Sequence, residues 1–343
     1  MKKGHQTTLY DIASRLNVSV VTVSKVFRGN YDISDELAKK VKVVANELGY
    51  IPNHLARNLS AHQSKTIGVV FPNIAHPFFS SALEEMYETA ISNDYELILG
   101  ISQDKEEREI QQLKNLMSMR VDGIIISVAN TTRDTAIFKR IIENGTALTF
   151  MDRVLNIPGS NKVVVDDLGG AYSATKRAVK SGHKRIAYLG GTAETNIGKD
   201  RFEGYTKAMQ EHSRVIDPGD VVQGGFTEED GYKGFKKIAA HKKKLPHCIV
   251  VVGSLLALGL YRALQELHLT IPDDVDVISF GVESINHPLL PQLSTIVQPS
   301  GELGKSAVEI TLENIRYTDS FKNRSVVIPF KERFVPPYYE SYL

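Results

Sequence analysis

The apolar positions in the first fifty residues predict three short helices. In the first, Thr8 and Asp11 form the start signal of a capping box. Asn17 can end this helix, because asparagine tolerates the left-handed conformation. The apolar stripe of the helix has the spacing of one helical face and consists of Leu9, Ile12, Ala13 and Leu16.

The second helix is predicted in spite of its composition. The stretch "NVSVVTVSKVFRG" (17–29) is rich in valine, which favours strands, but it lies between two segments with helical spacing. Ser19 is a good N-cap for a helix that begins at Val20. Val23, Val26 and Phe27 can then face the first helix. Packing decides here, because helix propensity is a weak prior.

The third helix is predicted to start after Ser34. Asp35 and Glu36 fall in its first turn, where negative charge suits the helix dipole. Gly49 suits the position just beyond its end. The predicted buried stripe of this helix consists of Leu37, Val41, Val44, Ala45 and Leu48.

Three short helices, with a brief connection between the first two, describe a helix-turn-helix. Val20, Val21 and Lys25 remain largely outside, near the end that meets base edges in this motif. A small apolar side chain can contact the thymine methyl group, and lysine can reach guanine acceptors. The hydroxyls of Thr22 and Ser24 suit phosphate oxygens. An ordinary three-helix packing module with exposed valines remains the alternative on periodicity alone.

From Thr66 onwards, apolar strands alternate with helices. The apolar runs include "TIGVVF", "GIIIS", "ALTFM", "RIAYLG", "CIVVVG" and "VDVISF". This alternation is typical of βαβ units and buried parallel sheets. There are too many segments for one sheet, so we expect two doubly wound lobes. A ligand cleft is then expected between them, at the carboxyl ends of the strands.

Charge is divided unevenly along the 343 residues, a length that suggests two or three domains. Residues 1–64 carry nine basic and five acidic side chains, a net charge of +4, which leaves −3 for the rest because the whole chain carries +1. The basic excess predicts an anionic partner for the N-terminal region.

The single cysteine excludes a disulfide framework and fits a cytosolic address. It is Cys248, in an apolar run, and we expect a buried structural thiol. No apolar run is long enough to span a bilayer, so no membrane partner is expected.

The N-terminal residues also carry a dense resemblance. "TLYDIASRLNVSVVTVSKVFRG" followed by "ISDELAKKVKVVANELGYIPNHLARNLSAHQSKTIGVVFP" is similar to the lactose-repressor (LacI) family. The resemblance continues through "HPFFSSAL", "VDGIIIS", "DRFEGY", "SFGVES" and "LSTIVQPSGELGKSA". It implies a fold like that of the periplasmic sugar-binding proteins for the body.

The resemblance implies that Val20, Val21 and Lys25 read bases and that residues 53–60 fold into a hinge helix on operator DNA. It also implies that Leu59 is pushed into the central minor-groove step. Taken by itself, "NHLARNLS" is a marginal helix, with Leu59 as a wedge and Arg57 near phosphates. A polar linker whose leucines pack on the next domain is the alternative. The expected DNA contacts are Thr8, Leu9, Tyr10, Ser19, Val20, Val21, Thr22, Ser24, Lys25, Asn53, Ala56, Arg57 and Leu59.

Effector contacts are implied by the resemblance at Phe78, Phe79, Asp152, Arg201, Phe226 and Glu283. Aromatic rings stack on the faces of sugars or bases. The planar guanidinium of Arg201 suits hydroxyls or a carboxylate. Core packing is the alternative for Phe79, and an interlobe salt bridge is the alternative for Arg201.

The sequence departs from the family at four pocket positions. Gly253 and Ser254 replace the usual Asn-Asp pair, and Gly281 or Val282 replaces the usual acidic residue. Losing these acceptors argues against a neutral monosaccharide. Arg201, with Arg153 or Lys199 nearby, would suit an acidic sugar, although Glu283 could supply the missing acceptor.

No catalytic, metal-binding or cofactor-binding motif is present, so we expect neither an enzyme nor a cofactor. The pair Asp166–Asp167 could suggest a cation site, but a carboxylate at a helix start is more often a cap.

We therefore expect a cytoplasmic, effector-controlled repressor that binds a palindromic operator in double-stranded DNA as a homodimer. Its effector is expected to be a sugar or an acidic sugar derivative. The main rival is a cytosolic or periplasmic small-molecule-binding protein without DNA activity. A second rival is an enzyme on a doubly wound fold.

The expected fold class is α/β, with a three-helix headpiece and two periplasmic-binding-protein-like lobes. The expected boundaries are 1–52 for the headpiece, 53–64 for the hinge, 65–168 with 297–328 for the first lobe, and 169–296 with 329–343 for the second.

Overall fold

The computed structural model describes residues 7–28, 33–50, 63–241, 244–317 and 322–335. The chain divides into two compact units, Met1–Ser64 and Lys65–Leu343. The predicted headpiece lies in the first unit, and we refer to the second unit as the body.

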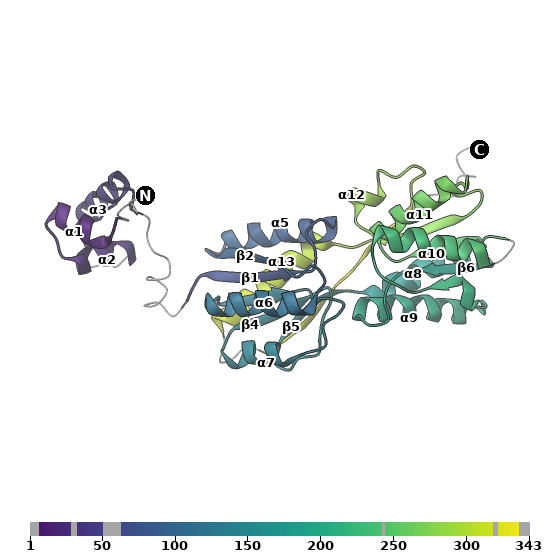
Figure 1. Cartoon of the computed structure of the whole chain (residues 1–343), viewed down its shortest axis with the longest axis horizontal. Coiled ribbons are helices and arrows are strands. Elements are labelled where there is room, and N and C mark those ends of the chain that lie inside the picture. Colours follow the sequence, from purple (N-terminus) through teal and green to yellow (C-terminus); the bar gives the residue numbers. More distant parts are fainter. Residues whose placement is uncertain (1–6, 29–32, 51–62, 242–243, 318–321, 336–343) are drawn as a thin grey trace. The chain divides into compact units, whose positions relative to one another are not determined.

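The described part of the headpiece contains three helices (Figure 1). Their caps are the predicted ones. Asn17 has a φ of 52°, in the left-handed region, and the Ser34 hydroxyl accepts a hydrogen bond from the Leu37 amide. The core contains the fully buried Ile12, Val23 and Val41. The helices are α1 (Leu9–Leu16), α2 (Val20–Arg28) and α3 (Asp35–Glu47).

The first lobe of the body is built on a six-stranded sheet, ordered β11-β5-β4-β3-β1-β2, in which all pairs are parallel. Helices α5 and α13 pack together on one side of it, and α6 and α7 lie on the other (Figure 1). The strands are β1 (Thr66–Phe71), β2 (Glu96–Ile101), β3 (Gly123–Ile126), β4 (Ala147–Met151), β5 (Asn161–Val165) and β11 (Ser325–Ile328). The helices are α5 (Pro77–Ile91), α6 (Glu106–Ser118), α7 (Ala136–Glu143) and α13 (Ser300–Arg316).

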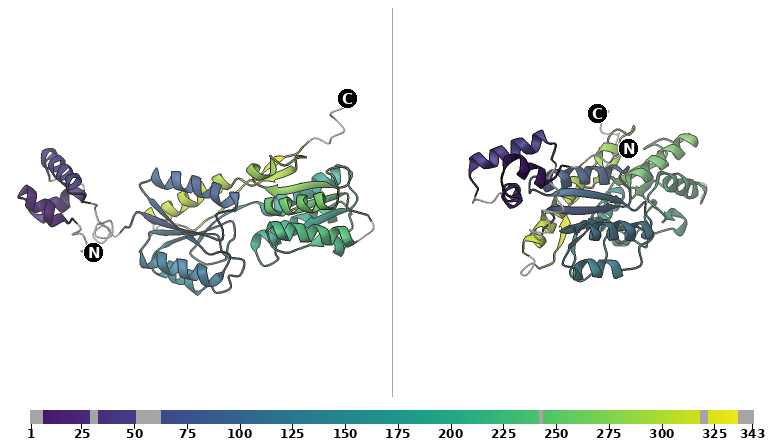
Figure 2. Two further views of the ribbon diagram at one scale, coloured as in Figure 1. Left: turned by 45° about the horizontal axis from the view of Figure 1, so that its top comes forward. Right: turned by 60° about the vertical axis from the view of Figure 1, so that its left-hand side comes forward.

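The second lobe is built on a sheet ordered β12-β10-β9-β8-β6-β7, parallel except for the pair of β12 with β10. Helices α8 and α9 form one packed pair and α10 and α11 form another. Figure 2 shows this lobe, in teal to green, in two further views. The strands are β6 (Ile186–Leu189), β7 (Val221–Val222), β8 (Cys248–Val251), β9 (Asp276–Gly281), β10 (Ser294–Val297) and β12 (Lys331–Arg333). The helices are α8 (Asp167–Lys180), α9 (Asn196–Glu211), α10 (Glu228–His241), α11 (Ser254–Glu266), the one-turn α12 (Glu283–Asn286) and the 3₁₀ turn η1 (Pro218–Asp220).

Glycines allow the helix pairs of the second lobe to pack closely. A Cβ at Gly204 of α9 would lie 2.2 Å from the carbonyl oxygen of Leu168, and one at Gly259 of α11 would lie 1.9 Å from that of Glu228. These contacts leave no room for a side chain, so the helix pairs depend on glycine at both positions.

The α/β prediction is confirmed by the two parallel-sheet lobes and the three-helix headpiece. Strands β1, β3 and β8 are buried because both faces of each sheet are covered there, which explains their continuous apolar runs. The predicted hinge helix lies outside the described residues. Within the described ranges, no helix combines the length and apolar character that a bilayer span requires.

Candidate DNA-binding and effector sites

The outward face of α2 carries the candidate base-reading residues. Val21 is 62% exposed, whereas Val23 and Val26 are buried in the headpiece core. Val20 and Lys25 are half-buried, and Val20 packs at the edge of the core. The valine-rich stretch is therefore an amphipathic helix, with Val21 at its amino end available to an external surface.

Several predicted DNA contacts also lie at helix caps. The amide of Thr22 donates to the Ser19 hydroxyl at 3.0 Å, and the two hydroxyl oxygens lie 2.8 Å apart. The amide and hydroxyl of Thr8 both donate to Asp11 Oδ2, each at 2.7 Å. These hydroxyls therefore hold the amino ends of α1 and α2, where backbone amides point outwards.

The remaining DNA candidates divide into described and undescribed ones. Tyr10 is 73% exposed at the start of α1, whereas Leu9 and Ser24 are half-buried. The other candidates lie outside the described residues and stay predictions: Asn53, Ala56, Arg57 and Leu59.

In the body, Asp152 lies at the carboxyl end of β4, in the left-handed region with a φ of 64°. Asp152 is buried, and its Oδ2 accepts a long hydrogen bond of 3.4 Å from the Ser127 hydroxyl. Burial raises the pKa of Asp152 to about 6, against the lowering effect of Arg153 and Arg201. The Asp152 carbonyl oxygen accepts a hydrogen bond from Asn196 of the second lobe at 3.0 Å, so it lies where the lobes meet.

Arg153 follows directly and also reaches the second lobe. It is buried, its Nη1 donates to Asp104 Oδ1 at 2.9 Å, and its Cζ lies 5.7 Å from the centroid of the Phe226 ring. Its buried Nε has no hydrogen-bond partner among the described residues. The edge of the first lobe thus presents a weakly bonded carboxylate and an unpartnered donor on consecutive residues.

Arg201 of α9 is fully engaged within the second lobe. Its Nε and Nη2 each lie 2.7 Å from Asp167 Oδ1, and its Nη1 donates to the Val252 carbonyl at 2.7 Å. Its guanidinium lies over the ring of Phe280, 4.7 Å from the centroid. The salt bridge joins α9 to α8, which packs on the second sheet. It is therefore not the interlobe bridge considered from the sequence.

The adjacent carboxylate, Asp166, has the predicted capping role. Its Oδ1 accepts a hydrogen bond from the Gly169 amide at 2.9 Å, at the amino end of α8. Asp166 and Asp167 thus have separate partners, a helix end and Arg201.

Phe78 and Phe79 lie at the start of α5, and the ring of His76 lies near both of their rings. Phe79 is buried in the core of the first lobe, 5.0 Å from the ring of Phe71, which supports the core-packing interpretation. The amide of Phe78 donates to His76 Nδ1 at 3.1 Å. Burial, together with the charges of Arg153 and Arg201, lowers the pKa of His76 to about 4. Phe78, Asp152, Arg201 and Phe226 therefore gather around one region.

Glu283 lies elsewhere, at the start of α12. It forms an ion pair with Arg333 at 3.0 Å and lines a cavity of about 450 Å³, together with Glu85, Lys305 and Lys331. The structure gives no contact between Glu283 and Asp152 or Arg201. Its predicted effector contact stays a prediction and would belong to that cavity.

The four atypical pocket positions form a packed unit. The Ser254 hydroxyl is buried and accepts a hydrogen bond from the Val282 amide at 3.0 Å. A Cβ at Gly281 would lie 2.0 Å from the same hydroxyl oxygen. The Ser254 hydroxyl is therefore engaged within the second lobe.

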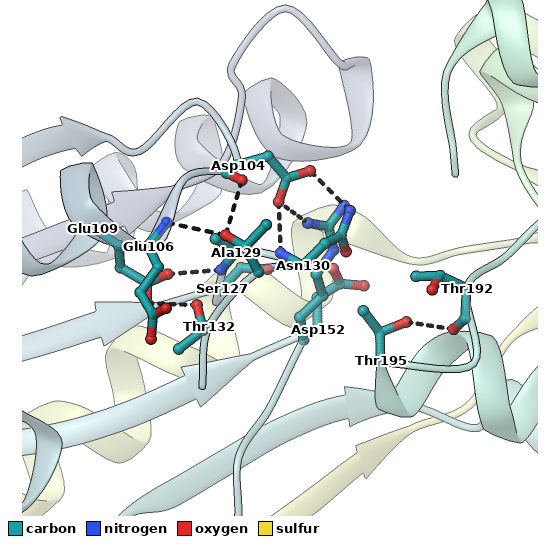
Figure 3. A network of polar contacts seen from close by, with 12 residues as sticks. Asp104, Glu106, Glu109, Ser127, Ala129, Asn130, Thr132, Asp152, Thr192 and Thr195 are labelled. Atoms are coloured by element: carbon teal, nitrogen blue, oxygen red, sulfur yellow. Dashed lines mark hydrogen bonds and ion pairs between the residues drawn. The ribbon is translucent and has the colours of Figure 1, made fainter. Parts of the chain in front are cut away.

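A group of carboxylates missed by the sequence analysis holds the loop beside Asp152. Figure 3 shows Asp104, Glu106 and Glu109 grouped around this loop, which follows β3. Asp104 accepts hydrogen bonds from the Asn130 amide at 2.7 Å and its Nδ2 at 2.9 Å. Glu106 Oε1 accepts from the amides of Arg133 and Asp134 at 2.7 and 2.6 Å.

Glu109 is the most buried member of the group, with no exposed surface. It accepts from the Ala129 amide at 2.7 Å and the Thr132 hydroxyl at 2.8 Å (Figure 3). Burial raises its pKa to about 7. The loop that it holds carries Arg133, which pairs with Glu194 of the second lobe. The only sequence signal for this arrangement is the acidic run "DKEERE" after β2.

Comparisons with known proteins agree with both units. Residues 8–53 match the model of the lacI family of bacterial regulatory proteins, and residues 175–333 match a periplasmic binding protein-like domain. The chain is 31% identical to the ribose operon repressor of Haemophilus influenzae over 311 residues, covering 90% of this chain and 92% of the relative.

Two solved structures are similar across the body or beyond it. The lac repressor dimer bound to operator and the anti-inducer ONPF has a TM-score of 0.83 at 24% identity, covering 96% of this chain and 98% of that one. A LacI family regulator from Enterococcus faecium with bound ribose has a TM-score of 0.69 at 25% identity, covering 78% and 96%. The relatives are transcriptional regulators and not enzymes. The chain therefore belongs to the LacI family of DNA-binding transcriptional regulators.

Proposed function

We propose that the protein is a cytoplasmic repressor that binds a palindromic operator as a homodimer and is controlled by a small molecule. Each headpiece would read one half-site, because a two-fold dimer matches a two-fold operator. The effector proposal rests on two consecutive residues where the lobes meet: Asp152, whose carboxylate is weakly bonded, and Arg153, whose buried Nε has no partner among the described residues.

The proposed readout uses the outer face of α2. Val21 would contact a thymine methyl group and Lys25 a guanine, with Val20 beside them at the edge of the core. Thr8, Ser19 and Thr22 would approach phosphates with the helix ends that they cap, because backbone amides there attract anions. Tyr10 is exposed enough to join them.

The effector is proposed to be a neutral, hydroxyl-rich molecule of the sugar class. Each arginine at the meeting edge already faces a carboxylate: Arg153 faces Asp104, and Arg201 faces Asp167. An anionic ligand would therefore meet little uncompensated positive charge. A hydroxyl can instead accept a bond from Arg153 Nε and donate one to Asp152, while a sugar face stacks on an aromatic ring such as Phe226.

An acidic sugar derivative is the second candidate, favoured by the buried Nε of Arg153 and by the loss of side-chain acceptors at Gly253 and Gly281. A carboxylate would strengthen the bond to Arg153, because a charged acceptor makes a stronger hydrogen bond. The two candidates predict opposite preferences for a matched pair of a sugar and its acid.

We propose that the domain organisation of the chain couples effector binding to DNA binding. We propose a headpiece of residues 1–52, a hinge of 53–64, a first lobe of 65–168 with 297–328, and a second lobe of 169–296 with 329–343. The sheet order, with β11 in the first sheet and β12 in the second, supports this proposal. An effector held by Asp152, Arg153 and Phe226 would contact both lobes and favour one arrangement of them, and thereby change operator affinity.

A thermal-shift screen of the full chain tests the effector class, since a bound ligand raises the apparent stability. The screen compares ribose and other neutral sugars with the corresponding sugar acids, for the wild type and for Arg153→Ala. We expect stabilisation by a neutral sugar and loss of that stabilisation in the variant. Stabilisation by acids alone would favour the second candidate. Stabilisation that survives Arg153→Ala would place the effector elsewhere.

A further inference from the structure

Three potential metal ligands from different segments meet at the amino ends of the strands in the second lobe. They are His183, in the turn between α8 and β6, Cys248, the first residue of β8, and Asp276, the first residue of β9. Their ligand atoms all lie within 4.8 Å of one another. The opposite end of the sheet, at the carboxyl ends of the strands, leads to Asn196, which bonds to Asp152. The group is therefore separate from the proposed effector site.

Strand pairing explains why two of the three side chains meet. Cys248 and Asp276 are register partners in the parallel pair of β8 and β9, so their side chains stand on the same face of the sheet. His183 is placed beside them by the end of α8, where its amide donates to the Ala178 carbonyl at 3.2 Å. The three positions are therefore fixed by regular structure and not by a loose surface loop.

The side chains have the chemistry and the access that a metal site needs. The thiol of Cys248 is fully buried, whereas His183 and Asp276 have side-chain exposures of 21% and 30%. His183 Nε2 lies 2.9 Å from Asp276 Oδ2, while Asp276 Oδ1 accepts from the Val277 amide at 2.8 Å, which fixes the carboxylate plane. The group thus has a buried sulfur ligand and an open side formed by nitrogen and oxygen.

We propose that His183, Cys248 and Asp276 bind a divalent transition-metal ion of the zinc type. Sulfur, imidazole and carboxylate together suit Zn²⁺ and its spectroscopic substitute Co²⁺, and disfavour Mg²⁺ and Ca²⁺, which prefer oxygen ligands. A water molecule would complete a tetrahedral site on the open side.

Binding requires small, specified changes. Zinc–nitrogen and zinc–oxygen bonds of about 2.0–2.2 Å place two tetrahedral ligands roughly 3.3 Å apart, close to the present separation of His183 and Asp276. The hydrogen bond between these two residues would be replaced by bonds to the metal, and the proton on His183 Nε2 would pass through solvent to Nδ1, so that the imidazole stays neutral. The Cys248 thiol would lose its proton to solvent and bind as the thiolate, so that one metal ion enters and one proton leaves. The metal would then link three segments of the second lobe and stabilise it.

The single cysteine of the chain gives a specific readout. The experiment adds Co²⁺ stepwise to the full chain under a phosphine reductant and follows the near-ultraviolet charge-transfer band of a cobalt–thiolate bond. Only Cys248 can give rise to that band. The variants are His183→Gln, which can keep a hydrogen bond to Asp276 but removes the imidazole, Asp276→Asn, and Cys248→Ser.

A second histidine–aspartate pair in the same lobe supplies the matched control. His241 Nε2 lies 3.0 Å from Asp217 Oδ1, with no cysteine grouped with them among the described residues. His241→Ala therefore removes a comparable histidine without touching the proposed site.

We expect a band that saturates at one cobalt ion per chain in the wild type and in His241→Ala. Cobalt affinity should fall at least about tenfold in His183→Gln and Asp276→Asn, and the band should vanish in Cys248→Ser. Stoichiometric Zn²⁺ should displace the cobalt and raise the melting temperature. Absence of the band in the wild type would overturn the proposal, as would a titration curve that His183→Gln leaves unchanged.

Discussion

Arg201 and Asp167 form a buried ion pair inside the second lobe, with 2.7 Å between Nη2 and Oδ1 and side-chain exposures of 3% each. The pair joins two helices that pack on the same sheet, and Arg201 also holds the Val252 carbonyl at the carboxyl end of β8. The guanidinium that sequence reasoning assigned to the effector therefore also fixes the edge to which an effector would bind.

Arg201→Ala should lower the free energy of unfolding of the body by about 3–5 kcal/mol, because it leaves the Asp167 carboxylate buried and unpaired. Urea denaturation of the full chain measures the effect. Arg201→Ala combined with Asp167→Leu should recover part of the loss, since the uncompensated charge is then removed. Wild-type stability of the single variant, with effector response lost, would instead assign Arg201 to ligand binding alone.

Asp152 should make effector affinity depend on pH. Its pKa is raised to about 6, and a hydroxyl that donates to the carboxylate binds the ionised form. Affinity should therefore be highest above pH 6 and fall as the pH drops through that value and Asp152 takes up a proton. Isothermal titration between pH 5 and 8 tests this with the neutral sugar that stabilises the protein. Asp152→Asn should bind more weakly, with a flat profile. A flat wild-type profile would exclude Asp152 as an acceptor of the ligand.

Glu109 should make the body less stable as the pH rises. Its pKa in the folded protein is about 7, raised from 4.5, so between these values the folded state binds the proton more tightly than the unfolded state. Its contribution to stability is therefore largest below about pH 4.5 and is lost as the pH rises to 7, with a slope of at most about 1.4 kcal/mol per pH unit.

Denaturation of the wild type and of Glu109→Gln is measured across this pH range. The difference between their free energies of unfolding should change with pH by that slope. The exposed Glu107 on the same helix supplies the control, and Glu107→Gln should leave the difference from wild type constant. Parallel curves for Glu109→Gln would contradict the assignment.

Substitutions of two exposed valines in the headpiece can distinguish an effect on DNA recognition from an effect on folding. Val21 on α2 is 62% exposed and Val43 on α3 is 56% exposed. Val21→Ala should weaken operator binding by about 1 kcal/mol or more and relax the preference at one base pair per half-site. Val43→Ala should change neither. Equal effects of the two substitutions would mean that α2 is not the reading helix.

Lys25→Ala should cost about 1–3 kcal/mol of operator binding and also relax the preference at one base pair. The measurement is a titration against single-base variants of the operator. If all sequences weaken equally, Lys25 contacts only phosphate.

Local features were predictable from the sequence because their partners lie within one helical turn. The caps at Thr8 and Ser34 and the left-handed Asn17 follow from side chains that bond to their own neighbourhood. The apolar strands were equally clear, since burial on both faces leaves continuous hydrophobic runs.

The candidate effector site was predictable only in part, because its contacts depend on pairs far apart along the chain. Asp167 lies 34 residues along the chain from Arg201, and Glu109 lies 20 residues from Ala129, whose amide donates a hydrogen bond to it. Phe79 shows the same limit, since a ring at the start of a helix suits a pocket or a core equally well until its neighbours are known. Ser254, which looked like a lost ligand, proved to bond the Val282 amide.

We propose that this chain couples sugar binding in the body to DNA binding by the headpiece. The most direct measurement is an anisotropy titration of the full chain on a duplex selected from a random library, with and without the stabilising neutral sugar. We expect a palindrome to be selected, and its affinity should change at least about fivefold with the sugar in the wild type and in Val43→Ala but not in Arg153→Ala. Equal operator affinity with and without a sugar that demonstrably binds would exclude this coupling, and failure to select any duplex would exclude specific DNA binding.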